Sequence, residues 1–166
     1  MLALDQFYRQ YYKQIVRRIA YLTGNVHIAE ELAQEVFVKL YTNPPEHENV
    51  LSWLYTVAAR TAYNYLRDDQ IHRQKEQQHF ESQMDIEGTP EAMMIENETI
   101  KSVHDSLATL STRDRTCLLM KHSGYKYAEI AACLEVEINA IGMIISRAQA
   151  KLKRNYEKRI EQEGVL

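Results

Sequence analysis

The sequence predicts an all-α protein made of two small helical bundles joined by a flexible polar linker, with a helix-turn-helix in the second bundle. Gly and Pro are scarce, at five and three of 166 residues, which leaves few of the turns that strands need. Apolar residues recur at spacings of three and four along most of the chain, the pattern of amphipathic helices. A glutamine-rich stretch interrupts this pattern near the middle, so two cores are expected.

Three helices are expected in the first bundle. The first covers about 4–22, and Gly24-Asn25 ends it, with Asn25 placed to cap the next helix. The second covers about 26–42 and stops at Asn43-Pro44-Pro45, because proline cannot continue a helix. The third begins near Asn49. Three helices with short links can enclose one small core.

The polar stretch sets the expected domain boundaries. Glutamines and charges replace apolar residues there, and such a composition favours a flexible linker. We therefore expect a first domain over 1–73, a linker over 74–89 and a second domain over 90–166.

The second domain is expected to be helical as well. Pro90 suits the first turn of a helix, and Ser111 is placed to cap another. Two further helical runs lie around the turn Glu135-Val136-Glu137, which is the layout of a helix-turn-helix. In that motif the second helix enters the major groove of DNA.

Composition limits the classes of function. The net charge is −3 and the pI about 6.1, so any DNA binding must rest on local basic patches. Neither a membrane span nor a signal peptide is indicated, and we expect a soluble cytoplasmic protein. Cys117 and Cys133 are expected to be reduced core residues, and the histidines lack the spacing of metal ligands. No catalytic constellation or phosphate-binding glycine loop is visible, so the sequence predicts neither an enzyme nor a cofactor.

The second helix carries a polar stripe. Glu31, Gln34, Glu35 and Val38 share spacings of three and four, whereas Leu32, Val36 and Phe37 turn toward the expected core. The stripe is either a solvated helix face or a docking surface for a basic partner, where charges supply orientation and specificity.

The third helix mixes aromatic side chains with cations and amides. Aromatic faces can stack on unpaired bases while arginines hold the backbone. The alternative is core packing with a solvated rim. The residues concerned are Trp53, Tyr55, Arg60, Tyr63, Asn64 and Arg67.

The order of these parts resembles the bacterial sigma-70 family, in particular its small extracytoplasmic-function (ECF) group. The resemblance rests on 29–37, on Trp53-Leu54-Tyr55-Thr56-Val57-Ala58, on the polar linker, on 107–110 and on the terminal helix-turn-helix. It covers essentially the whole chain. It implies a promoter-specificity subunit that binds core RNA polymerase, recognises promoter DNA and aids strand opening. It also implies an anti-sigma factor as a partner, often a membrane-anchored one, with no membrane insertion of the chain itself.

The resemblance implies three sets of site residues. Those that bind the core polymerase are Glu31, Leu32, Gln34, Glu35 and Phe37. Those that contact the minus-ten element are Trp53, Tyr55, Arg60, Tyr63, Asn64 and Arg67. Those that contact the minus-thirty-five element are Lys126, Tyr127, Asn139, Ala140, Met143, Arg147 and Lys151.

The chain departs from the family pattern in the helix-turn-helix. Glu135 stands where glycine is frequent in the family, so either this residue adopts a left-handed backbone at a cost of roughly 1 kcal/mol or the turn differs. The start of the reading helix, 140–144, lacks the expected basic side chains, and Ile144 and Ile145 belong either to the core or to an exposed apolar patch. Two other hypotheses therefore stay open: an autonomous helix-turn-helix regulator, and a sigma-like co-factor whose minus-thirty-five reader is eroded.

Overall fold

The computed structural model describes residues 2–46, 49–76 and 105–164. The chain divides into two compact units, Met1–Gly88 and Thr89–Leu166. The described residues form α-helices joined by turns and bends, with no strand among them, and residues 105–108 are helical as well. The predicted all-α class is confirmed.

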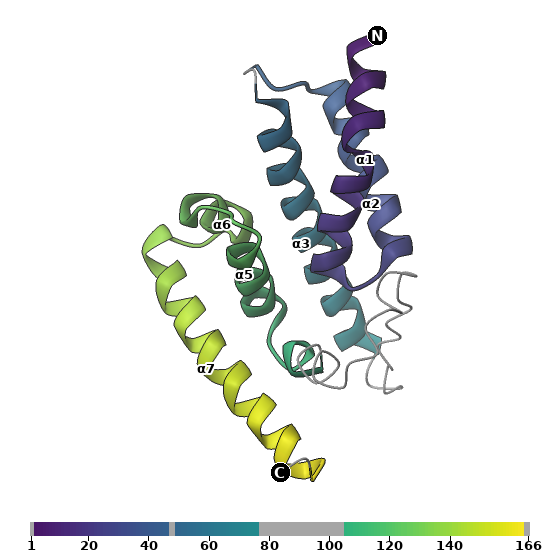
Figure 1. The fold of residues 1–166 in the computed structure, drawn as a ribbon. Helices are drawn as coiled ribbons and strands as arrows, with labels where there is room; N and C mark the ends of the chain where they lie inside the picture. Colours follow the sequence, from purple (N-terminus) through teal and green to yellow (C-terminus); the bar gives the residue numbers. More distant parts are fainter. Residues whose placement is uncertain (1, 47–48, 77–104, 165–166) are drawn as a thin grey trace. The chain divides into compact units, whose positions relative to one another are not determined.

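Three helices that contact one another build the first unit: α1 (Leu2–Thr23), α2 (Val26–Thr42) and α3 (Val50–Glu76) (Figure 1). Each contributes one apolar face to a shared core, because side chains three and four residues apart lie on the same side of a helix. The largest core side chains that are fully buried include Ile15, Ile19, Val36 and Leu54.

The link between α1 and α2 follows from local chemistry. Gly24 has φ +71°, a left-handed conformation that glycine adopts without a steric penalty, directly after the end of α1. The side chain of Asn25 accepts a hydrogen bond of 3.1 Å from the Ile28 backbone N–H. The expected cap of α2 is therefore present.

Helix α3 includes the start of the expected linker, for which the sequence left a helical beginning open. It continues to Glu76, so residues 74–76, which were expected in the linker, are helical. Gln, Lys, Arg and Glu have good intrinsic helix propensity, and the Arg73–Asp69 ion pair of 3.0 Å adds support one turn apart. A polar segment can thus remain helical beyond its apolar face. The rest of the expected linker and the helix expected from Pro90 fall outside the described residues.

The second unit contains α5 (Thr112–His122), α6 (Tyr127–Leu134) and α7 (Ile138–Gln162). The three helices contact one another, and α6 and α7 form the helix-turn-helix. The Ser111 side chain accepts a hydrogen bond of 3.1 Å from the Asp114 N–H, as expected of a cap. The core of this unit includes both cysteines, Cys117 and Cys133, which are buried and form no disulfide. Burial raises the pKa of Cys117 to about 11.

One side of α7 makes contacts with the rest of the second unit along most of the helix. Ile141, Ile145 and Ala148 are buried near its start. Further along, Asn155 donates a 2.7 Å hydrogen bond to the Thr109 hydroxyl, and Arg159 forms a 2.7 Å ion pair with Asp105. The opposite side of α7 faces solvent over the same stretch.

The turn of the helix-turn-helix contains a left-handed residue. Glu135 adopts φ 56° and ψ 44°, and its N–H donates to the Ala131 carbonyl, which ends α6. The N–H of Val136 donates to the same carbonyl at 3.1 Å. A Cβ in this conformation costs roughly 1–2 kcal/mol, so glycine would fit this position better than the glutamate that occupies it.

We expect Glu135→Gly to stabilise the second unit relative to Glu135→Ala by about 1 kcal/mol, because both changes remove the side chain but only glycine relieves the left-handed strain. Thermal unfolding followed by circular dichroism measures the difference. The fluorescence of Trp53, the single tryptophan, reports on the first unit and should not shift. Equal stability of the two variants would contradict the assignment of strain to this turn.

Candidate functional site

The outward face of α2 carries the polar stripe. Glu31, Gln34 and Glu35 are exposed, whereas Leu32 and Phe37 are buried among the core residues of the first unit. Of the five residues predicted on this helix to bind the polymerase, three are therefore presented to solvent and two hold the helix in place.

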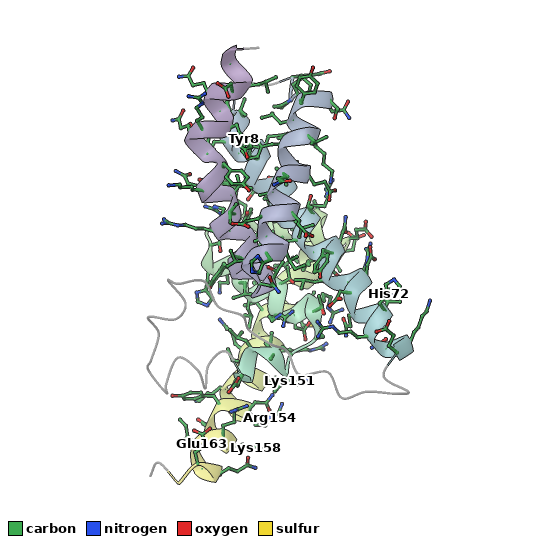
Figure 2. The ribbon with its side chains drawn as sticks, turned by 90° about the vertical axis from the view of Figure 1, so that its right-hand side faces the viewer. Tyr8, His72, Lys151, Arg154, Lys158 and Glu163 are labelled. Carbon is green, nitrogen blue, oxygen red and sulfur yellow. The ribbon has the colours of Figure 1, made fainter. Side chains whose placement is uncertain are left out.

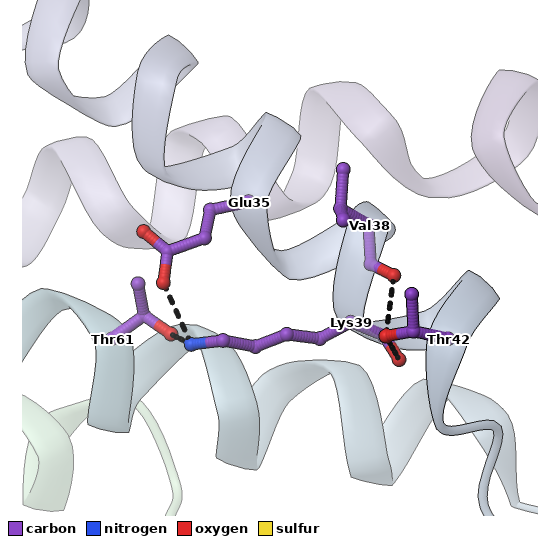
Figure 3. A network of polar contacts seen from close by, with 5 residues as sticks. All are labelled: Glu35, Val38, Lys39, Thr42 and Thr61. Atoms are coloured by element: carbon purple, nitrogen blue, oxygen red, sulfur yellow. Dashed lines mark hydrogen bonds and ion pairs between the residues drawn. The ribbon is translucent and has the colours of Figure 1, made fainter.

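A polar network fixes one end of the stripe. The Lys39 ammonium lies 2.8 Å from a Glu35 carboxylate oxygen and donates a 3.2 Å hydrogen bond to the Thr61 hydroxyl of α3 (Figure 3). Thr61 is buried, so the Lys39 side chain extends from α2 toward α3. Its ammonium group pairs with the Glu35 carboxylate there. The partial neutralisation of Glu35 leaves Glu31 as the more available acid of the stripe.

Aromatic side chains of α1 border the stripe on one side. The Tyr8 and Tyr12 rings stack with centroids 4.7 Å apart, and Tyr8 meets the edge of Phe37 at 5.1 Å. Burial chiefly raises the pKa of Tyr12, and a hydrogen bond from the Gln34 side chain lowers it. Tyr12 of α1 therefore lies near Gln34 of α2, a proximity between two helices that has no signal in the sequence of either one.

Two exposed apolar residues extend the stripe toward the end of α2. Val38 is 60% exposed and Tyr41 is 69% exposed. They follow Gln34 by four and seven residues, which places them on the same face. The sequence pattern already places Val38 on this stripe, and the same helical spacing from Gln34 indicates Tyr41, which was not predicted. Exposed apolar side chains beside a polar stripe are typical of an interaction surface.

The outward face of α3 collects four of the six residues predicted to contact the minus-ten element. Trp53, Arg60, Asn64 and Arg67 are separated by seven, four and three residues, so they share one side of the helix. Arg60 is exposed, and the other three are partly exposed. This face combines an indole, an amide and two guanidinium groups, which are the groups that bind unpaired bases and phosphates.

The two tyrosines of the predicted set lie elsewhere. Tyr63 is only 7% exposed. Tyr55 donates a 2.9 Å hydrogen bond to the Gln14 side chain, and the Arg18 guanidinium covers its ring at 3.6 Å from the centroid. Tyr55 follows Trp53 by two residues, which is about 200° around a helix, so it faces α1. Both tyrosines therefore support the fold, and neither presents an open ring to a base.

In the second unit the residues predicted to contact the minus-thirty-five element are nearly all at the surface. Lys126 and Tyr127 mark the start of α6 and are exposed. On α7, all predicted residues are exposed except Ala140, which is partly exposed; the exposed ones are Asn139, Met143, Arg147 and Lys151. Ile144 and Ile145 are buried, which decides the open question in favour of the core.

The basic side chains of α7 form a longer stripe than the sequence suggested. Arg147, Lys151, Arg154 and Lys158 follow one another at intervals of four, three and four residues, and all are exposed. Figure 2 labels the last three of them on successive turns of the helix. Lys158 was not expected in this set, although helical spacing from Arg154 indicates it. None of the four has an acidic partner within 4.0 Å among the described residues.

The described part of the chain also bears on metal binding and on membrane insertion. No group of three or more His, Cys, Asp or Glu side chains there is arranged to hold a metal ion. None of its helices is long and apolar enough to cross a membrane. The functional candidates are therefore the three outward helix faces of α2, α3 and α7.

Two family models match the chain, Sigma-70 region 2 over residues 7–71 and Sigma-70, region 4 over residues 100–152. Among curated proteins, RNA polymerase sigma factor YlaC of Bacillus subtilis (strain 168) is 26% identical over 168 residues, covering 98% of this chain and 97% of that protein. ECF RNA polymerase sigma factor SigW of the same organism is 24% identical, covering 86% and 83%.

A solved structure shares the fold. The sigma factor RpoE from Bartonella quintana, crystallised with the anti-sigma factor NepR, matches with a TM-score of 0.67 at 20% identity. The match covers 95% of this chain and 98% of that chain.

The position of Tyr55 leads to a test of its structural role. Tyr55→Phe removes only the hydrogen bond to Gln14 and should cost about 0.5 kcal/mol. Tyr55→Ala also removes the ring beneath Arg18 and should cost roughly 2–3 kcal/mol. Urea unfolding followed by Trp53 fluorescence gives both values. Two equally small losses would show that the ring does not join α1 to α3.

Proposed function

The chain belongs to the sigma-70 family, in its extracytoplasmic-function group, and from this premise we propose that it is a promoter-specificity subunit of bacterial RNA polymerase. It binds the core enzyme, recognises promoter DNA and aids strand opening. One observation carries the proposal: the matches to region 2 and region 4 occur in the family's order within one chain, over 7–71 and 100–152. Each of the three activities is assigned to one of the outward helix faces of α2, α3 and α7.

Core polymerase binds the stripe on α2. Glu31, Gln34 and Glu35 give the contact its orientation and specificity, since charged pairs at an interface select a partner more than they add affinity. Val38 and Tyr41 add apolar area at the end of the stripe. The ion pair between Lys39 and Glu35 limits the side-chain freedom of Glu35 that would otherwise be lost on binding.

Helix α3 captures a base of the minus-ten element. Stacking of a base on an aromatic ring is worth roughly 1–3 kcal/mol, which is comparable with the few kcal/mol that flipping a base out of the duplex costs. Trp53 supplies the ring, and Arg60 and Arg67 hold the phosphates of the exposed strand. Strand opening is thus driven by binding, and we assign no catalytic step to the chain.

Helix α7 contacts the minus-thirty-five element in the duplex. Arg147 and Lys151 neutralise phosphates, which positions the helix without specifying a sequence. The net charge of −3 opposes binding of the free chain to DNA. Promoter binding therefore depends on assembly with the polymerase, and the site of action is the cytoplasm. We assign polymerase docking and the minus-ten contact to the first unit, and the minus-thirty-five contact to the second.

We also propose that an anti-sigma factor regulates the chain by covering the faces of α2 and α7. Family membership supports this proposal. The complex with NepR is a property of the Bartonella quintana protein, and it illustrates how a sigma factor of this fold can be held. An autonomous regulator would leave the α2 stripe without a role, and a gel shift with tight binding of the free chain to a two-fold operator would favour that hypothesis.

Run-off transcription with cognate core polymerase tests the proposal. The chain should produce a transcript with a defined start, and core enzyme alone should not. Glu31→Lys places a positive charge in the stripe and should weaken binding to the core enzyme about tenfold, or ~1.4 kcal/mol. Glu46→Lys makes the same charge change at an exposed position outside the helix and should leave binding within about twofold. Absence of any template-specific product would refute the proposal.

The α3 face gives a second prediction. Trp53→Ala should reduce open promoter complexes by roughly 5- to 150-fold, the equivalent of one lost base stack, while binding to the core enzyme stays unchanged. Permanganate reactivity of thymines in the minus-ten element measures opening. Tyr55→Phe is the matched control on the opposite side of the same helix, and it should open the promoter normally. Equal loss in both variants would argue against Trp53 as the stacking residue.

A further inference from the structure

The first three turns of α7 expose no charged side chain before Arg147. Their outward residues are Ile138, Asn139, Gly142, Met143 and Ser146. Ile138 is 48% exposed and Met143 is 57% exposed. This is the end of a recognition helix whose residues contact base edges in the major groove. The chemistry of these side chains therefore decides which bases the helix can select.

This face is unsuited to guanine. Guanine presents two acceptors in the major groove, O6 and N7, and Arg or Lys is the usual side chain that binds both. The nearest cation along α7 is Arg147, more than two turns from the start of the helix. Lys126 belongs to α6, the helix that crosses the backbone in this motif, so it is placed for phosphate. Glu137, exposed directly before α7, adds negative charge near the acceptors of any guanine.

The same face suits adenine and thymine. An Asn side chain can bind the N6 amino group and N7 of adenine together, and apolar side chains contact the C5 methyl of thymine. Asn139 and Met143 are four residues apart and lie on one side of the helix. Ile138 adds a second exposed apolar group next to Asn139. An A·T step would satisfy all three side chains.

Gly142 points to a close approach of the helix backbone to the base pairs. A Cβ added at this position would meet no heavy atom within 4 Å, so nothing inside the protein requires glycine there. Glycine is disfavoured in a helix relative to alanine. Around the helix axis it lies between Ile138 and Asn139 on the exposed face, which leaves room for base edges.

We propose that α7 reads a minus-thirty-five element made of A·T pairs, in which Asn139 binds adenine and Met143 and Ile138 contact thymine methyl groups. Arg147, Lys151, Arg154 and Lys158 bind phosphates alongside this reading face and hold the helix in register. The inference rests on the proposed function and adds to it the class of promoter that the chain selects. It also gives the uncharged start of α7 a reading role of its own.

Selection from a promoter library tests the inference. The library keeps one minus-ten element and randomises the minus-thirty-five element, and holoenzyme reconstituted from core polymerase and the full chain transcribes it. A·T pairs should be enriched at two or more adjacent positions, and a G·C pair at one of them should reduce transcription about 5- to 150-fold. Enrichment of guanine, or a flat profile, would overturn the inference. A flat profile with normal initiation leaves the proposed function intact, whereas no initiation from any template refutes that function.

Three variants separate reading from clamping. Asn139→Ala should relax the preference at one adenine, and Met143→Arg should shift the preference toward guanine at a neighbouring position. Lys151→Ala is the control, which should weaken binding to all sequences alike and lower the salt dependence by about one phosphate contact. If Asn139→Ala weakened binding to all promoter sequences equally, Asn139 would not be a residue that reads a base.

A fourth variant tests the close approach at Gly142. Gly142→Ala should raise the melting temperature, because alanine favours a helix and the Cβ meets no protein atom. It should nevertheless lower promoter affinity in the holoenzyme. An affinity equal to that of the wild-type chain would show that the backbone stays away from the bases.

Discussion

Packing of the apolar face of α2 against α1 and α3 is the interaction on which the first unit's candidate surface depends. Ala29, Val36 and Leu40 are buried in this packing together with Leu32 and Phe37. A helix with one face fixed in a core has no freedom to rotate, so the opposite face is determined as well. That face consists of Glu31, Gln34, Glu35, Val38 and Tyr41. The core thus positions residues that it does not contain.

The same constraint sorts the aromatic residues of α3. Burial of Leu54, Ala58 and Ala62 turns Trp53 outward and Tyr55 toward α1. The Arg18 guanidinium over Tyr55 then connects α1 to α3. Tyr55, which was predicted to contact DNA, instead helps to hold the helix that presents Trp53. An aromatic-rich helix therefore presents a single ring, together with Arg60, Asn64 and Arg67, rather than a broad stacking surface.

In the second unit, α7 separates two tasks along one helix. Its start exposes uncharged side chains, and Arg147, Lys151, Arg154 and Lys158 follow on later turns. Contacts on the inner side, from Ile141 to the Arg159–Asp105 ion pair, hold both parts in one rigid element. An acidic chain with one short basic stripe has little attraction for random DNA, and this favours a protein that binds promoters only within a larger assembly.

The sequence by itself determined the features that depend on neighbouring residues. These are the helical periods and the caps at Asn25 and Ser111. Only the tertiary structure decided which functional side chains are open. Tyr55 is covered by Arg18, 37 positions away, and Lys39 beside the polar stripe is bonded to Thr61, 22 positions away. Such contacts arise when helices distant in the chain pack together, and no local pattern encodes them.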